Sequence, residues 1–281
     1  MSKYKLIATD LDGTLLRNDK TISERTKAVL EEASKQGVEI VPCTGRLYRM
    51  LPECIKELPF LRYAVCINGA AVFDIRNDVS LAGKLTDLDT SIKIMEYLDT
   101  IDVIYDAYVD NTGYMSQSSF DKRYDTKYIV SPFYRNNFEN YRTKVPDLKT
   151  FLKDKGMDVQ KFQFFSQDKK ILDDAVEHIH KLYPELMITE SNPDDVEING
   201  PEATKGNGLK LLADIMGIDM DEVLSFGDGG NDLSMMKASG FSVAPSNAPE
   251  FVKNEADYVT LSNEEDGVAD AIEKFILSSL D

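Results

Sequence analysis

Two short apolar runs, which lie almost the whole length of the chain apart, each lead directly into an acidic cluster. Leu6–Thr9 is followed by Asp10-Leu11-Asp12-Gly13-Thr14, and Val223–Phe226 is followed by Gly227-Asp228-Gly229-Gly230-Asn231-Asp232. Short apolar runs bounded by turn residues are typical of buried strands, and open α/β sheets bind ligands at the carboxyl ends of their strands. Four carboxylates that met at such an edge would repel one another unless a divalent cation lay between them. The sequence therefore predicts a parallel sheet with an acidic, metal-binding edge.

Strand-like and helix-like segments alternate at both ends of the sequence, at the spacing of βαβ units. In the N-terminal part, the predicted elements are strand Tyr4–Thr9, a helix capped by Ser23 that ends at Gly37, strand Val38–Pro42, a helix that contains Leu47 and Met50 and is interrupted or bounded by Pro52, and strand Tyr63–Ile67. In the C-terminal part, they are strand Val196–Ile198, helix Lys205–Met216, strand Val223–Phe226, helix Leu233–Ser239 and strand Phe241–Ala244. We therefore predict an α/β fold with a Rossmann-like parallel-sheet core.

The middle of the chain follows a different pattern. From about residue 85 to residue 190 the regular alternation is lost, and Asn111–Gly113 is a hairpin signal between two short strands. This pattern indicates a mainly antiparallel α+β unit that is inserted into the core. Residues 1–84 and 191–281 are predicted to form the core domain, and residues 85–190 a second domain that is inserted into it.

Composition excludes several classes of protein. A net charge of −17 disfavours binding to nucleic acid, because a phosphate backbone would be repelled. No apolar stretch approaches the ~20 residues of a membrane span, and the first residues lack the features of a secretory signal. We therefore expect a cytoplasmic protein with no membrane partner. The three cysteines show no CxxC spacing, and His178 and His180 lie two residues apart on different faces of a predicted helix, which makes a histidine-based zinc site or histidine catalysis improbable.

The acidic residues after the first strand fit the chemistry of phosphoryl transfer. This reaction needs an attacking oxygen in line with phosphorus and compensation of the charge on the transferring oxygens. Asp10 is placed at a strand end to act as a nucleophile that forms an acyl phosphate. Asp12 can protonate the leaving group and later deprotonate water. Gly13 would allow backbone N–H groups to approach the phosphoryl oxygens closely.

Other polar residues are predicted to complete the site. Asp228 would complete the cation site, and Asp232 would be a direct or water-mediated ligand; Mg²⁺ favours such oxygen ligands. Asn231 would hold a neighbouring charged group in place. Lys205, at the start of a predicted helix, would place a positive charge on the phosphate, and Thr44 would donate its hydroxyl. Asp228 or Asp232 alone could instead cap the following helix.

At this point the chain resembles a known family, the haloacid dehalogenase-like hydrolases, and within it the Cof-type phosphatases. Four segments occur in the family's order, namely Asp10-Leu11-Asp12-Gly13-Thr14-Leu15, Thr44-Gly45-Arg46, Lys205-Gly206 and Gly227-Asp228-Gly229-Gly230-Asn231-Asp232. The resemblance covers essentially the whole chain. It implies that Asp10 is the nucleophile and Asp12 the acid/base, and that Mg²⁺ is bound by Asp10, Asp228 and the Asp12 carbonyl. It also places Gly45 and Arg46 at the phosphate. It further implies that residues 1–84 and 191–281 form the catalytic core and that residues 85–190 form a cap domain that selects the substrate.

The sequence departs from the family's pattern at two places. Pro42-Cys43 precedes Thr44 where a small apolar residue is common, and Pro245-Ser246 stands where Met-Gly is frequent. Neither change removes a catalytic group. The shape of the affected loops, and any binding role of Asn247, are left open.

Residues 121–170 of the insert combine an excess of lysine and arginine with many aromatic residues. One interpretation is a small packed core with a solvated face. The other is a lid that meets an anionic or ring-bearing substrate and excludes water on closing, in which case changing Arg135 or Tyr134 would raise KM.

The function that these features predict is Mg²⁺-dependent hydrolysis of small phosphate monoesters through an aspartyl-phosphate on Asp10. Sugar phosphates, flavin mononucleotide and pyridoxal phosphate all fit as substrates. The nearest alternative is a phosphotransferase or mutase that passes the phosphoryl group to a sugar. A binding protein that keeps the fold without catalysis is a further alternative, which the complete set of polar residues disfavours. The oligomeric state is not indicated.

Overall fold

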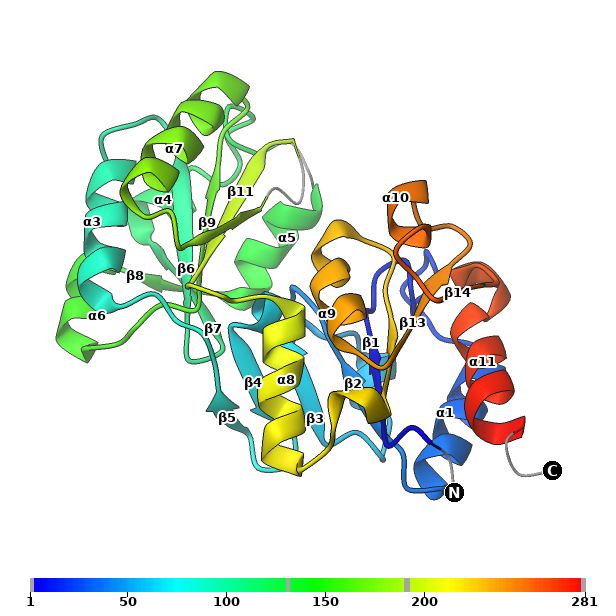
Figure 1. Cartoon of the computed structure of the whole chain (residues 1–281). Helices are drawn as coiled ribbons and strands as arrows, with labels where there is room; N and C mark the ends of the chain where they lie inside the picture. The colour runs from blue at the N-terminus through cyan, green and yellow to red at the C-terminus, as the bar shows by residue number, and fades with distance from the viewer. Residues whose placement is uncertain (1–2, 130–131, 190–192, 279–281) are drawn as a thin grey trace. The chain divides into compact units, whose positions relative to one another are not determined.

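The computed structural model, which describes residues 3–129, 132–189 and 193–278, divides into two units. The first unit combines Met1–Gly83 with Thr204–Asp281, and the second is the continuous segment Lys84–Ala203 (Figure 1). An ion pair of 2.8 Å between Lys84 Nζ and Glu202 Oε2 joins the two ends of the second unit. The predicted boundary at 190/191 differs from this division, because residues 193–203 belong to the second unit.

A five-stranded parallel sheet forms the centre of the first unit. Its strand order is β14-β13-β12-β1-β2, and each neighbouring pair is parallel. The strands are β1 (Leu6–Thr9), β2 (Glu39–Pro42), β12 (Val223–Phe226), β13 (Phe241–Pro245) and β14 (Tyr258–Thr260). In the register of β1 and β12, Leu6 lies opposite Val223 and Thr9 lies opposite Phe226. The predicted parallel-sheet core is confirmed, and the two acidic clusters follow adjacent strands at one edge of it.

Helices cover both faces of this sheet, because its strands carry apolar side chains on both sides. Ile7 packs in a cluster with α1 and α11, whereas Leu6 packs in a second cluster with α8 and α9. The helices are α1 (Glu24–Lys35), α8 (Lys205–Met216), α9 (Leu233–Ala238), α10 (Glu250–Lys253) and α11 (Gly267–Ile272), the last followed by a π-helical turn at Glu273–Leu277. Ser23 caps α1 as predicted, since its side chain accepts a hydrogen bond from the Thr26 N–H.

The segment between β2 and the insert differs from the prediction in two respects. The helix expected around Leu47 and Met50 is a 3₁₀ turn (Tyr48–Met50), and α2 (Glu53–Lys56) begins only after Pro52. Proline has no N–H to continue the turn, so it separates the two pieces. The predicted strand at residue 63 is β3 (Tyr63–Cys66), but it pairs antiparallel with β4 (Ala71–Asp74), which pairs antiparallel with β5 (Val79–Ala82). The sequence did not predict β4 or β5.

A six-stranded sheet with helices packed against it forms the second unit, which confirms the predicted α+β architecture of the insert (Figure 1). Its strand order is β10-β11-β9-β6-β7-β8, and all pairs are antiparallel except β7 with β8. The strands are β6 (Ile104–Val109), β7 (Thr112–Ser116), β8 (Arg142–Val145), β9 (Lys161–Phe165), β10 (Met187–Thr189) and β11 (Asp195–Asn199). Helices α3 (Leu88–Leu98), α6 (Leu148–Lys155) and α7 (Lys169–Leu182) pack against this sheet through one apolar cluster.

Strand β11 corrects the prediction that Val196–Ile198 returns to the core. Its residues pair with β9 on one side and with β10 on the other, so it is an interior strand of the inserted sheet. The chain therefore returns to the first unit only after this strand, immediately before Lys205.

The aromatic stretch of the insert contains two helices, α4 (Gln117–Asp121) and α5 (Pro132–Tyr141). Tyr128 and Phe138 are buried in a small apolar cluster of this stretch, as in the packed-core interpretation. The Arg135 Nη2 group donates to the Ile129 carbonyl at 2.7 Å. The Tyr134 side chain lies outside the described residues. Across the described ranges, every helix is too short or too polar to cross a membrane.

Candidate active site

The strand ends of the parallel sheet bring the predicted site residues together in the first unit. Asp10 follows β1, and its backbone N–H donates to the Phe226 carbonyl of β12 at 2.9 Å. Thr44 follows the end of β2, where the Cys43 N–H donates to the Thr9 carbonyl at 2.8 Å. These bonds continue the sheet by one residue on each side of β1. Asp10 and Thr44 are therefore held by backbone hydrogen bonds and are both buried.

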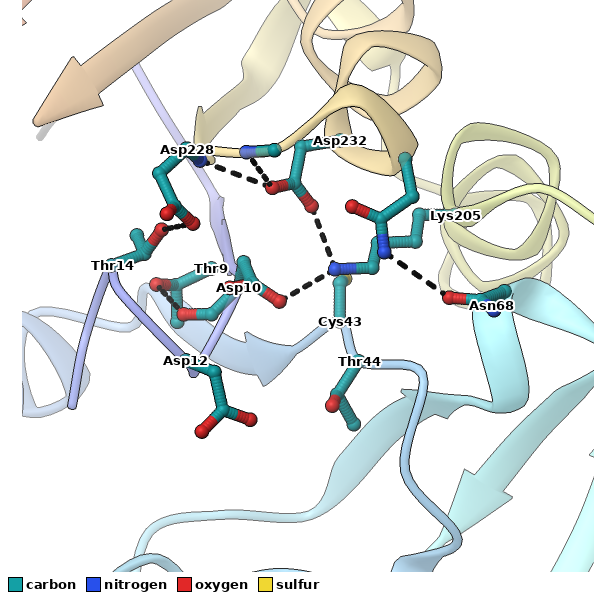
Figure 2. A network of polar contacts seen from close by, with 12 residues as sticks. Thr9, Asp10, Asp12, Thr14, Cys43, Thr44, Asn68, Lys205, Asp228 and Asp232 are labelled. Carbon is teal, nitrogen blue, oxygen red and sulfur yellow. Dashed lines mark hydrogen bonds and ion pairs between the residues drawn. The ribbon is translucent and has the colours of Figure 1, made fainter. Parts of the chain in front are cut away.

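Lys205 lies between two of the acidic residues (Figure 2). Its ammonium nitrogen is 2.5 Å from Asp10 Oδ1 and 2.7 Å from Asp232 Oδ1, and only 1% of its side chain is exposed. Thr204 caps α8 by accepting a hydrogen bond from the Asn207 N–H, so Lys205 is the first residue of the helix. A cation at a helix N-terminus is unfavourable without nearby anions, and the two carboxylates provide them.

Burial controls the ionisation of this cluster. Loss of hydration, together with the neighbouring carboxylates, raises the pKa of Asp10 to about 7, although the Lys205 ammonium acts in the opposite direction. For Lys205 the ion pairs together prevail over burial. Burial would lower its pKa, but the attraction of Asp10 and Asp232 outweighs burial and raises the pKa above its ordinary value. Lys205 therefore remains a cation.

Asp232 holds the loop after β12 in addition to Lys205. Its Oδ2 atom accepts hydrogen bonds from the backbone N–H groups of Asp228 and Gly229, at 3.0 and 2.8 Å. Both of its carboxylate oxygens are thus engaged within the protein. This observation favours a positioning role for Asp232 over the direct ligand role that the sequence left open.

Three carboxylates could hold a divalent cation. One oxygen each from Asp10, Asp228 and Asp232 lie within 4.8 Å of one another. Burial is the main cause that raises the pKa of Asp228, whose Oδ1 accepts a 2.9 Å hydrogen bond from the Thr14 hydroxyl. The three carboxylates together carry more negative charge than the Lys205 ammonium compensates. Such a set of oxygen donors fits Mg²⁺.

Gly13 is needed where the first loop meets Asp228. Its φ of +86° is a conformation that residues with a Cβ rarely adopt. A Cβ atom at this position would lie 2.4 Å from Asp228 Oδ2. The glycine therefore leaves the space in which the Asp228 carboxylate sits, a role different from the backbone donor that the sequence predicts for it.

Asp12 points away from the other carboxylates (Figure 2). Arg46 binds it with two hydrogen bonds, from Nε to Oδ2 at 2.7 Å and from Nη2 to Oδ1 at 2.8 Å. Lys20 Nζ lies 2.7 Å from the same Oδ1 atom. Burial acts to raise the pKa of Asp12, but these two cations outweigh burial and lower it. The predicted phosphate contact of Arg46 is therefore replaced, in this conformation, by a contact with Asp12.

Two asparagines near the site have contacts that the sequence did not reveal. Asn231 Nδ2 donates to Asn68 Oδ1 at 3.3 Å, so the predicted residue Asn231 is joined to a residue that the sequence analysis did not single out. Asn247 Nδ2 donates to the Gly13 carbonyl at 2.8 Å. Asn247 thereby holds the loop after β1, and this contact exists despite the unusual Pro245-Ser246 before it.

Comparison with known proteins gives a consistent result. Residues 7–272 match a family model described as haloacid dehalogenase-like hydrolase. The 5-amino-6-(5-phospho-D-ribitylamino)uracil phosphatase YcsE of Bacillus subtilis is 30% identical over 97% of this chain and 96% of its own length. YbjI of Escherichia coli, which is also named a 5-amino-6-(5-phospho-D-ribitylamino)uracil phosphatase, is 31% identical over 97% of this chain and 96% of its own length. A crystal structure of a haloacid dehalogenase-like hydrolase from Bacteroides thetaiotaomicron superposes with a TM-score of 0.80, at 28% identity over 96% of this chain and 99% of that one.

Proposed function

This chain belongs to the haloacid dehalogenase-like hydrolases and is a phosphatase, and we propose that it hydrolyses small phosphate monoesters through an aspartyl-phosphate on Asp10. The observation that carries the proposal is the placement of Asp10 directly after the carboxyl end of β1. One of its carboxylate oxygens is held by Lys205, and the carboxylates of Asp228 and Asp232 lie beside it. A nucleophile so fixed has little freedom to lose when the substrate arrives.

The proposed reaction has two steps. In the first, a carboxylate oxygen of Asp10 attacks phosphorus, the bond from phosphorus to the ester oxygen breaks, and the departing oxygen takes a proton from Asp12. In the second, Asp12 takes a proton from water, the water oxygen attacks phosphorus, and the acyl phosphate bond breaks to release inorganic phosphate. Lys205 and the Thr44 hydroxyl would bind the phosphoryl oxygens. Arg46 and Lys20 bind the Asp12 carboxylate here and lower its pKa, so Asp12 must take up a proton and turn toward the departing oxygen before it can donate that proton.

We propose Asp10, Asp228 and the Asp12 carbonyl as the protein ligands of Mg²⁺, with Asp232 supporting them through the backbone of Asp228 and Gly229. When bound there, the ion would supply a positive charge that compensates the phosphoryl oxygens. In the same arrangement Gly45 would let the substrate phosphate approach the backbone after β2.

The relatives suggest a class of substrate. Two are named for a phosphate at the end of a ribityl chain attached to a pyrimidine, and flavin mononucleotide carries its phosphate on a ribityl chain as well. We therefore propose a terminal phosphate on a polyhydroxylated chain, a class that includes sugar phosphates. Release of inorganic phosphate in the absence of any acceptor would distinguish this hydrolysis from transfer to a sugar.

Replacement of the nucleophile tests the proposal. Asp10→Asn should lower the hydrolysis of p-nitrophenyl phosphate and of a ribityl phosphate by several orders of magnitude, while circular dichroism shows an unchanged fold. Asp78→Asn, which changes an exposed residue of the turn between β4 and β5, is the matched control and should keep full activity. Chelation of divalent cations should abolish the activity and Mg²⁺ should restore it. Retained activity of Asp10→Asn would exclude this mechanism.

A further inference from the structure

The turn after β3 has an unusual backbone. Three consecutive residues have positive φ angles, at 54° for Ile67, 54° for Asn68 and 92° for Gly69. A β-branched residue such as Ile67 is rarely found in this region, because its Cβ substituents collide with the backbone. Such a conformation persists only where the surrounding structure holds it in place, and strained residues of this kind gather at functional sites.

Backbone hydrogen bonds join this turn to the segment after β2. The Ile67 N–H donates to the Arg46 carbonyl and the Asn68 N–H donates to the Thr44 carbonyl, both at 3.1 Å. The Asn68 side chain then lies over Gly45, where an added Cβ would be 3.0 Å from Asn68 Oδ1. The Thr44-Gly45-Arg46 segment is therefore fixed against the turn.

The turn also contacts the start of α8, which carries Lys205. A Cβ on Gly69 would lie 2.0 Å from the Thr204 carbonyl oxygen, and a Cβ on Gly208 would lie 2.7 Å from the Gly69 Cα. Glycines at 69 and 208 thus allow the backbone of the turn and the first turn of the helix to touch. The position of Lys205 depends on this contact.

The remaining contact is with the loop after β12. Asn231 Nδ2 donates to Asn68 Oδ1, and only 8% of Asn68 is exposed (Figure 2). Residues 67–69 therefore contact the segments that supply Thr44, Lys205 and Asn231, which come from three distant parts of the sequence.

We propose that Asn68 is a positioning residue, which acts through Asn231 to set the geometry of the groups around the transferring phosphoryl group. This inference rests on the proposed function of the site. The phosphoryl group is common to all substrates, so loss of Asn68 affects good and poor leaving groups alike. A residue that served only the stability of the turn would leave the kinetics of the folded enzyme unchanged.

The first experiment removes the side chain without adding strain. Asn68→Gly is suitable because glycine accepts a positive φ. Asp78→Gly is the matched control, since Asp78 has a φ of 53° and is exposed. In Asn68→Gly, kcat/KM should fall about tenfold for p-nitrophenyl phosphate and for a ribityl phosphate to the same extent, whereas Asp78→Gly should keep the wild-type value. A folded Asn68→Gly enzyme with wild-type kinetics, or a loss confined to one substrate, would overturn the proposal.

A double-mutant cycle tests whether Asn68 acts through Asn231. If it does, Asn68→Gly combined with Asn231→Ala should lose no more activity than the more damaging single change. Losses that multiply would show that the two residues act independently, against the proposal.

A binding measurement separates failure of this inference from failure of the proposed function. If the wild-type protein hydrolysed no phosphate monoester, the proposed function would fail, but titration calorimetry with inorganic phosphate and Mg²⁺ would still test Asn68. The proposal expects weaker phosphate binding in Asn68→Gly than in wild type and in Asp78→Gly. Equal binding in all three proteins, or binding in none, would contradict it.

Discussion

The behaviour of single residues in this site depends on how each buried charge is compensated. Lys205 is almost fully buried and is paired with both Asp10 and Asp232. A buried charge that loses its partner is strongly destabilising, because the remaining charge cannot regain its hydration. Lys205 therefore keeps two carboxylates together before the substrate arrives, in addition to the phosphate-binding role proposed for it.

Arg46 provides a test of the role of Asp12. If Arg46 serves to orient Asp12, Arg46→Gln should lower kcat/KM about ten- to hundredfold for an alkyl phosphate, whose leaving group needs a proton. It should have little effect on p-nitrophenyl phosphate, because nitrophenolate leaves without one. Steady-state kinetics with both substrates measure the difference.

Lys20→Gln is the companion variant, because Lys20 contacts the same carboxylate from a more exposed position. It should show the same dependence on the leaving group, with a smaller loss. Equal losses of both substrates in Arg46→Gln would instead assign Arg46 to the phosphate itself.

The sequence could place the charged residues of the site but not their rotamers. Asp10, Asp228 and Lys205 were predictable because they follow strand ends or begin a helix, and the topology brings those points together. The contact of Arg46 with Asp12 was not predictable, because spacing along the chain does not determine where a flexible side chain points. Asn68 was missed because Asn-Gly after a strand is an ordinary turn signal, and its contact with Asn231 exists only in the folded chain.

Among the helices and strands, the long amphipathic or apolar segments were predicted well and the pairing of short strands was not. Helix Lys205–Met216 has the predicted bounds. Strand β11 was assigned to the wrong unit, because an isolated apolar alternation does not reveal its neighbours. Its partners β9 and β10 both belong to the insert, and the antiparallel pairing with them, which is visible only in the folded chain, shows that β11 belongs to the insert as well.

The junction between α1 and α11 leads to a prediction about pH. Asp266 precedes α11 with a φ of 60°, and its Oδ1 accepts a 2.9 Å hydrogen bond from Arg17 Nη2. Burial acts to raise the pKa of Asp266, but hydrogen bonds from Ser23, Arg17 and Thr26 outweigh it and lower the pKa below 3.8. A carboxyl group with a lowered pKa stabilises the fold above its unfolded pKa, and this stabilisation is lost as the pH falls through the folded value.

Asp266→Asn should therefore unfold at a lower temperature than wild type at pH 7, and the difference should shrink as the pH falls below about 5. Asparagine tolerates the left-handed backbone, so the change isolates the charge. Thermal unfolding followed by circular dichroism at several pH values measures it. Asp78→Asn controls for the loss of one negative charge, and a difference that grows toward low pH would contradict the prediction.

Each of the two units has apolar clusters of its own. The six-stranded sheet of the second unit packs with α3, α6 and α7 in one cluster, and its residues form one continuous segment. The ion pair of Lys84 with Glu202 holds the ends of this segment together. These are the properties of a domain that can fold alone.

We therefore expect residues 84–203, produced as a separate fragment, to unfold cooperatively with heat. Leu148→Ala in the same fragment should lower the free energy of unfolding by about 2–5 kcal/mol, because Leu148 is fully buried in the apolar cluster. Calorimetry of both fragments measures this. A fragment that shows no cooperative transition would mean that the segment needs the remainder of the chain to fold.

The way in which the chain leaves and re-enters the first unit also affects how such proteins diversify. It leaves after Gly83 and returns at Thr204, immediately before Lys205, which forms an ion pair with Asp10, and one ion pair ties the two ends of the intervening segment together. A lineage could lengthen, shorten or exchange that segment without altering the distances among the reacting side chains. New specificities would then evolve in one segment, while the chemistry is inherited intact in the other.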